Sequence, residues 1–155
     1  MKKIVLFDID YTLFDTDLFK DSQLKTYKLY NEVEDVLKDL SQVAEIGIFS
    51  QGEDVFQKEK LKQTLIDSHF GEENVHIFAL KDYNIGSVIE KYKDRSVFFV
   101  DDKLEVLKLA KDLNGDVFTI WIKRGPFAAN QENITGFEPD AIIGNLSEVT
   151  PIINS

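Results

Sequence analysis

The sequence predicts an α/β fold in three layers, with a central parallel sheet and helices on both of its faces. Short apolar runs alternate with segments in which apolar residues recur at helical spacing, which is the pattern of a parallel sheet. The apolar runs are mostly continuous, as expected for strands covered on both faces. At 155 residues, the chain suits a single Rossmann-like domain over residues 1–155.

Six apolar runs are the expected strands, at residues 3–8, 45–49, 75–80, 96–100, 117–122 and 141–143. Helical spacing predicts helices over 32–43, about 53–68, 85–92 and 104–113. The second of these rests on Leu61, Leu65 and Ile66. Asn114-Gly115 follows the last helix and is a typical C-terminal stop.

The composition excludes several function classes. With 28 acidic and 18 basic residues the formal charge is −10, which argues against nucleic acid as a partner. The absence of cysteine excludes disulfides, thiolate metal sites and cysteine nucleophiles. The apolar run Ile4–Phe7 is too short for a signal-peptide core or a membrane span. We therefore expect a cytoplasmic protein with no membrane partner.

Two pairs of carboxylates follow two of the expected strands. Asp8 and Asp10 end the first run, and residues two apart on an extended chain point the same way, roughly 6.5 Å apart. Asp101-Asp102 ends the fourth run. Either pair alone would fit a solvated acidic loop. Together, at the carboxyl ends of parallel strands where sites form, they indicate a site for a hard cation such as Mg²⁺.

Other polar residues are expected at the same edge of the sheet. Ser50 and Gln51 directly follow the second strand, and Lys81 directly follows the third. Lys58, Lys60 and Lys91 instead fall within helical patterns, where a solvated face is expected. Lys81 is therefore the lysine that we assign to the site.

Four segments together resemble the motifs of the haloacid dehalogenase-like (HAD) superfamily of phosphotransferases, over essentially the whole chain. Phe7–Leu13 is similar to the family's DxDxT motif, and Ile48–Gly52 to its second motif, a Ser or Thr after a strand. Lys81 resembles the third-motif lysine, and Val100–Glu105 the acidic fourth motif. The resemblance is to capless or minimally capped members, because only 37 residues separate Thr12 from Ser50. A small flap at about 13–30 is then expected.

The resemblance also implies roles for individual residues. Asp8 would be the nucleophile, and Asp10 the general acid and then the base, oriented by Thr12. The residues implied in phosphate binding are Thr12, Ser50, Gln51 and Lys81. Mg²⁺ would be held by Asp8, the main-chain carbonyl of Asp10 and Asp102. Asp101 is a further possible ligand, and the roles of Asp101 and Glu105 stay open.

The expected function is a Mg²⁺-dependent phosphatase that hydrolyses a phosphate monoester through an aspartyl-phosphate. Asp10 favours this over dehalogenation, because a halide leaving group needs no acid. Two alternatives are a catalytically idle HAD-like protein that binds phosphate or acts as a scaffold, and a receiver-like phosphoacceptor domain. The partner would be a phosphorylated small molecule or a phosphorylated macromolecule, and the oligomeric state is left open.

Overall fold

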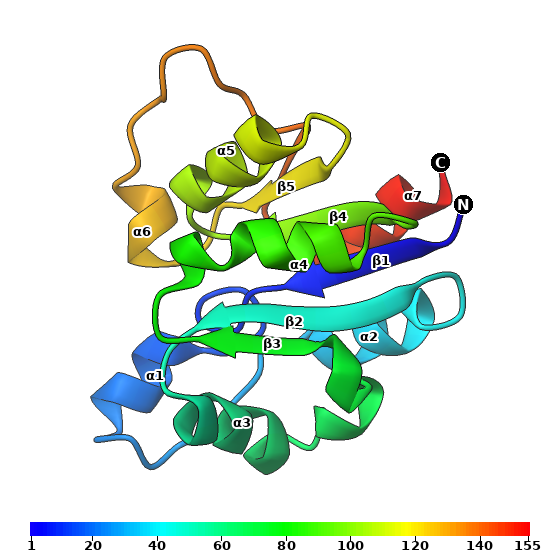
Figure 1. The fold of residues 1–155 in the computed structure, drawn as a ribbon. Coiled ribbons are helices and arrows are strands. Elements are labelled where there is room, and N and C mark those ends of the chain that lie inside the picture. Colours follow the sequence, from blue (N-terminus) through cyan, green and yellow to red (C-terminus); the bar gives the residue numbers. More distant parts are fainter.

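In the computed structural model, residues 1–155 build a six-stranded sheet with helices on both faces (Figure 1). All neighbouring strands pair in parallel, in the order β3-β2-β1-β4-β5-β6. The strands are β1 (Lys3–Phe7), β2 (Glu45–Gln51), β3 (Val75–Phe78), β4 (Ser96–Asp101), β5 (Phe118–Ile122) and β6 (Ala141–Ile143). The predicted fold class is confirmed. The receiver-like alternative is wrong, because receiver domains have the order 2-1-3-4-5.

The seven α-helices are α1 (Thr16–Asp21), α2 (Val33–Leu40), α3 (Asp54–Gln63), α4 (Ile85–Lys91), α5 (Leu104–Leu113), α6 (Gly125–Ala129) and α7 (Val149–Asn154). Alternate side chains of β1 enter two separate cores. Val5 and Phe7 join the core under α2 and α7, whereas Ile4 and Leu6 join the core under α4 and α5. None of these helices combines the length and the apolar character that a bilayer crossing requires.

The helix expected over about 53–68 is shorter than predicted. It ends at Gln63, and Leu65 follows it with a positive φ of 63° and 76% of its surface exposed. The prediction failed because α3 does not bury a stripe of leucines. Its buried residues are Gln57, Lys60 and Leu61, and two of these three are polar.

The expected flap of about 13–30 contains α1 and an aromatic cluster. Phe14, Phe19 and Tyr27 pack on one another with ring centroids 4.8–6.1 Å apart. Phe56 of α3 joins them, 5.9 Å from Phe19. α1 and α6 lie beyond the arrowheads of the strands, at the end of the sheet opposite the two chain termini, and α3 lies alongside β3 (Figure 1). The flap therefore borders the edge at which the acidic residues were predicted.

Candidate active site

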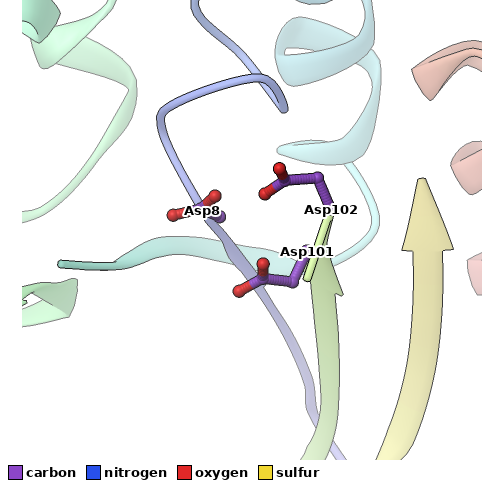
Figure 2. Close-up of side chains that lie close together, drawn as sticks. All are labelled: Asp8, Asp101 and Asp102. Atoms are coloured by element: carbon purple, nitrogen blue, oxygen red, sulfur yellow. The ribbon is translucent and has the colours of Figure 1, made fainter. Parts of the chain in front are cut away.

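Three carboxylates meet where the strand order reverses. Asp8 directly follows β1. Asp101 is the last residue of β4, which pairs with β1 on the side opposite β2, and Asp102 comes next in the chain (Figure 2). Each of the three offers one oxygen within 4.8 Å of the others, and all three residues are buried. Reversal of strand order leaves a crevice at the carboxyl ends, where ligands bind in α/β sheets. The structure thus brings these sequence-predicted residues to one point.

Lys81 is the cation of this cluster. Its Nζ lies 2.5 Å from Asp101 Oδ2 and 3.3 Å from Asp8 Oδ1. Its backbone N–H donates to Gln51 Oε1 (3.2 Å), which fixes the turn that carries the lysine. Burial alone would lower the pKa of Lys81, but the charges of Asp101 and Asp8 outweigh it and raise the pKa. Lys81 is therefore a permanent ammonium shared by two carboxylates.

Asp102 has no such partner. Both of its carboxylate oxygens are buried and neither accepts a hydrogen bond. Its main-chain carbonyl accepts from Trp121 Nε1 (2.8 Å), so the backbone of Asp102 is held in place by a side chain of β5. Burial, with the charge of Asp8 second, raises the pKa of Asp102 to about 10. An unpaired buried carboxylate is costly, so without a cation this group holds a proton, and a bound cation would favour its ionised form. These oxygens therefore fit a cation ligand.

The charge of Asp8 is also poorly compensated. Burial, followed by the charge of Asp101, raises its pKa to about 6 even with Lys81 in contact. Three carboxylates here share one lysine, so the cluster carries an excess of negative charge. A divalent cation bound between Asp8 and Asp102 would remove that excess and favour the ionised forms. The donor set therefore suits a hard metal such as Mg²⁺.

Asp10 does not point into this cluster. Its Oδ1 is 2.8 Å from Lys60 Nζ and 2.9 Å from Thr16 Oγ1. Its Oδ2 accepts from Gln57 Nε2 (3.0 Å). The two carboxylates of the Asp8–Ile9–Asp10 sequence thus face different partners, and Asp10 is turned toward α3.

The prediction that Lys60 lies on a solvated face is wrong. Its side chain is only 5% exposed, because α3 turns it inward between Phe14, Phe19 and Phe56 and onto Asp10. Lys58, on the same helix, is 50% exposed and pairs with Asp54, as expected of a surface lysine.

Two of the implied phosphate-binding residues lie below the cavity surface. Ser50 is fully buried, and its Oγ accepts from Gln57 Nε2 (3.0 Å). Thr12 is also fully buried, and its hydroxyl has no hydrogen-bond partner. The threonine hydroxyl that contacts Asp10 is that of Thr16, not that of Thr12 as the resemblance implied.

The loop that follows β1 is tied to the C-terminal part of the chain through Arg124. Its guanidinium donates to the Thr12 carbonyl (3.3 Å) and pairs with Glu32. The same Glu32 carboxylate accepts from the Leu146 backbone N–H (3.0 Å). Burial opposes ionisation of Glu32, but the Arg124 and Leu146 hydrogen bonds outweigh it and hold its pKa below the usual range. Arg124 is thus a structural link under the site.

A cavity of about 340 Å³ opens above these groups. That volume lies in the range of small-molecule sites. In its lining, the rings of Tyr11 and Phe127 meet edge to face, with centroids 5.9 Å apart. The lining residues are Asp8, Asp10, Tyr11, Thr16, Phe19, Lys20, Leu24, Gln51, Phe56, Lys60, Lys81, Asp82, Asp102, Lys103, Glu105, Val106 and Phe127. Asp8, Asp10 and Asp102 can therefore be reached by the same ligand.

Sequence reasoning missed Thr16, Gln57 and Lys60 as site residues. One signal for the last two was present: they lie three apart in a helix that lacks an apolar stripe, so they share one face of it. A helix packed on a core that presents polar residues on its inner face indicates a polar site beneath it. Thr16 had no comparable signal.

No protein-family model matches the chain, and no curated protein matches it either. Solved structures do. One, described as a haloacid dehalogenase-like hydrolase from Burkholderia xenovorans LB400, aligns over 98% of this chain and 97% of its own at 20% identity, with a TM-score of 0.80. The chain has the haloacid dehalogenase-like fold.

Two further structures with the haloacid dehalogenase-like fold align over nearly their whole length. YfnB from Bacillus subtilis, described as a HAD-hydrolase bound to magnesium, has 15% identity, 99% coverage of each chain and a TM-score of 0.78. The L-2-haloacid dehalogenase from Xanthobacter autotrophicus with chloropropionic acid covalently bound has 12% identity, coverage of 100% of this chain and 99% of its own, and a TM-score of 0.78. Proteins described as phosphatases occur among the matches too.

Proposed function

We propose that the chain is a Mg²⁺-dependent phosphatase that hydrolyses a phosphate monoester through an aspartyl-phosphate on Asp8. One observation carries the proposal: the two buried, unpartnered oxygens of Asp102 lie beside Asp8, and both residues line the same cavity. An anionic carboxylate can attack an anionic phosphate only where positive charge neutralises both. Two unpartnered oxygens beside the nucleophile suit the binding of such a charge.

The proposed metal ligands are Asp8, Asp102 and the main-chain carbonyl of Asp10. Both oxygens of Asp101 are already engaged, Oδ2 by Lys81 and Oδ1 by the Lys103 backbone N–H (2.9 Å). We therefore assign Asp101 to holding Lys81 rather than to binding the metal directly. When bound, Mg²⁺ supplies positive charge to the nucleophile and to the phosphoryl oxygens.

In the proposed reaction, an Asp8 carboxylate oxygen attacks phosphorus and the bond from phosphorus to the leaving oxygen breaks. Asp10, protonated for this step on Oδ2, the oxygen that does not face Lys60, gives that proton to the departing alkoxide. Asp10 then takes a proton from water, which attacks the phosphorus of the aspartyl-phosphate and releases inorganic phosphate and the Asp8 carboxylate. Lys81 offers positive charge to the phosphoryl oxygens in both steps. The side chain of Asp10 is 29% exposed and lines the cavity, so it can reach a bound ester.

Dehalogenation is the competing reaction for this fold. Asp10 supports the phosphatase, because an alkoxide needs a proton to leave and a halide does not. The excess negative charge around Asp8 supports it too, since it calls for a cation that attack on a carbon–halogen bond does not require. Retention of both Asp8 and Asp10 in one cavity argues against a catalytically idle phosphate-binding protein. The cavity volume of about 340 Å³ supports a phosphorylated small molecule or a single exposed phosphate of a larger partner.

The test is phosphate release from 4-nitrophenyl phosphate, with Mg²⁺ and with EDTA. Wild type is compared with Asp8→Asn and with Asp112→Asn, a surface control on α5 that pairs only with Lys108. We expect Mg²⁺-dependent turnover in wild type and in the control, and its loss in Asp8→Asn. Turnover that survives Asp8→Asn, or that is unaffected by EDTA, would contradict the proposal.

A further inference from the structure

The inward face of α3 carries two polar side chains whose only common target is Asp10. Lys60 Nζ lies 2.8 Å from Asp10 Oδ1, and Gln57 Nε2 lies 3.0 Å from Asp10 Oδ2. Both residues are almost fully buried, at 5% and 2% exposure. A helix that buries a lysine and a glutamine in place of apolar residues gives up hydrophobic stabilisation there. The arrangement therefore calls for a functional explanation.

Lys60 is placed so that only Asp10 can balance its charge. The ammonium lies 5.0–5.4 Å from the ring centroids of Phe14, Phe19 and Phe56. These rings favour a cation but offer it no anion. Asp10 is the one carboxylate within ion-pair distance of Lys60. A buried charge is tolerated when it is paired, so the lysine and Asp10 hold each other in place.

Gln57 and Thr16 complete the hold on Asp10. The Gln57 amide also lies 3.0 Å from Ser50 Oγ and 3.2 Å from the Gln51 carbonyl, which fixes the amide against β2. Thr16 donates to the oxygen of Asp10 that also faces Lys60. Each oxygen of Asp10 thus has an assigned donor, and the carboxylate has one orientation at the wall of the cavity.

We propose that Lys60 is a positioning residue that fixes the orientation of Asp10 for proton transfer to and from the reacting phosphate ester. The inference rests on the proposed phosphatase function. Lys60 acts through Asp10, and Gln57 supports it from the same helix face. Nothing in the sequence motifs of the fold points to this lysine, since it lies within a helix and not after a strand.

The leaving group of the substrate distinguishes this role from a merely structural one. Proton transfer to the leaving oxygen matters most for an alkoxide and least for a stable phenolate. The value of kcat/KM reports the steps up to loss of the leaving group. If Lys60 orients Asp10, its removal lowers kcat/KM far more for an alkyl phosphate than for an activated aryl phosphate. A loosened fold would lower both values alike.

The experiment compares Lys60→Met, Lys60→Arg and wild type on 2-glycerol phosphate and on 2,4-dinitrophenyl phosphate. Methionine keeps an apolar stem between the three rings and removes the charge. For Lys60→Met we expect kcat/KM to fall about 10²-fold on the alkyl ester, toward the low end of a full general-acid contribution, and less than about threefold on the aryl ester. Lys60→Arg should recover part of the loss. Lys58→Met, on the exposed side of the same helix, should match wild type.

Two results would overturn the inference. One is a value of kcat/KM for Lys60→Met that changes by the same factor on both esters, including no change on either. The other is a full further loss when Lys60→Met is added to Asp10→Asn, because a residue that acts through Asp10 should have little effect once Asp10 is gone.

A crystal structure of Lys60→Met gives a readout that does not depend on turnover. We expect the Asp10 side chain in a different rotamer or in several, and an unchanged rotamer would refute the positioning role. Wild type inactive on both esters would count against the phosphatase proposal alone, because the rotamer of Asp10 would still report on Lys60.

Discussion

Asp8 and Asp10 are two residues apart in the sequence, yet their electrostatic settings are opposite. Asp8 shares a single lysine with Asp101 and lies beside Asp102, whose oxygens have no partner. Asp10 has its own lysine and two further donors. The protein alone satisfies Asp10, but it leaves negative charge in excess around Asp8. The surroundings of Asp8 therefore suit an external cation, whereas the charge and hydrogen bonds of Asp10 are matched by side chains of the protein.

The largest expected effect separates the two carboxylates by their chemistry. Asp8→Asn should remove turnover of every phosphate ester, a loss of at least about 10⁴-fold, since no nucleophile remains. Asp10→Asn should cost about 10²–10⁴-fold on an alkyl phosphate and clearly less on 2,4-dinitrophenyl phosphate. Steady-state kcat/KM on both esters measures this. Equal losses in the two variants on the aryl ester would refute the division of roles.

The second prediction concerns how Mg²⁺ and Asp102 affect the stability of the folded protein. Saturating Mg²⁺ at about 100 times its Kd should stabilise wild type by about 2.7 kcal/mol. Asp102→Asn should abolish this gain and, without metal at pH 7, should be no less stable than wild type, because a carboxyl with a pKa of about 10 is already neutral there and the substitution removes no charge. Thermal unfolding with Mg²⁺ and with EDTA measures both effects. A metal-free Asp102→Asn protein less stable than wild type would contradict the account.

The third prediction is a pH dependence of the metal-free protein. Burial, followed by neighbouring acids, raises the pKa of Asp8 to about 6 and that of Asp102 to about 10, so the folded state binds protons more tightly than the unfolded state does. The unfolding free energy should therefore decrease as the pH rises from about 4 through about 6 and on toward about 10. Urea unfolding in EDTA measures it, and Asp102→Asn should flatten the upper part of the curve. A stability that increases across this range in EDTA would contradict the assignment.

The smallest effect is expected for a single hydrogen bond to Asp10. Thr16→Val removes one of the donors to Asp10 and leaves Lys60 and Gln57 in place. A single hydrogen bond contributes about 0.5–1.5 kcal/mol, so kcat/KM on 2-glycerol phosphate should fall by about tenfold or less. A loss as large as that of Lys60→Met would show that the threonine, and not the lysine, controls Asp10.

The sheet and the acidic cluster were predictable because both follow from strand patterns. Continuous apolar runs marked the strands, and the residues at or shortly after their carboxyl ends, Asp8, Asp102 and Lys81, were expected to meet at that edge of a parallel sheet. No knowledge of side-chain contacts was needed for that step. The exact ends of elements were less accessible, as Leu65 shows: its positive φ ends a helix that the apolar pattern would continue.

The surroundings of Asp10 could not be predicted in the same way. Helical periodicity identifies buried positions only when they are apolar. The lack of an apolar stripe in α3 was a signal that its inner face is polar, but it did not show that Gln57 and Lys60 contact Asp10. The contact with Thr16 depends on the loop after Asp10, where Tyr11 adopts a positive φ of 62° that its residue type does not favour. Such contacts arise from tertiary structure, and no local sequence pattern specifies them.

The strand order also has a consequence for synthesis of the chain. β1 is made first, but one of its two partners, β4, begins only at Ser96. Until then β1 is an exposed edge strand, open to pairing with other chains. Asp8 likewise emerges long before Asp101 and Asp102, so a nascent chain holds only part of the proposed metal site. Mg²⁺ would therefore bind at the proposed site only after β4 has paired with β1.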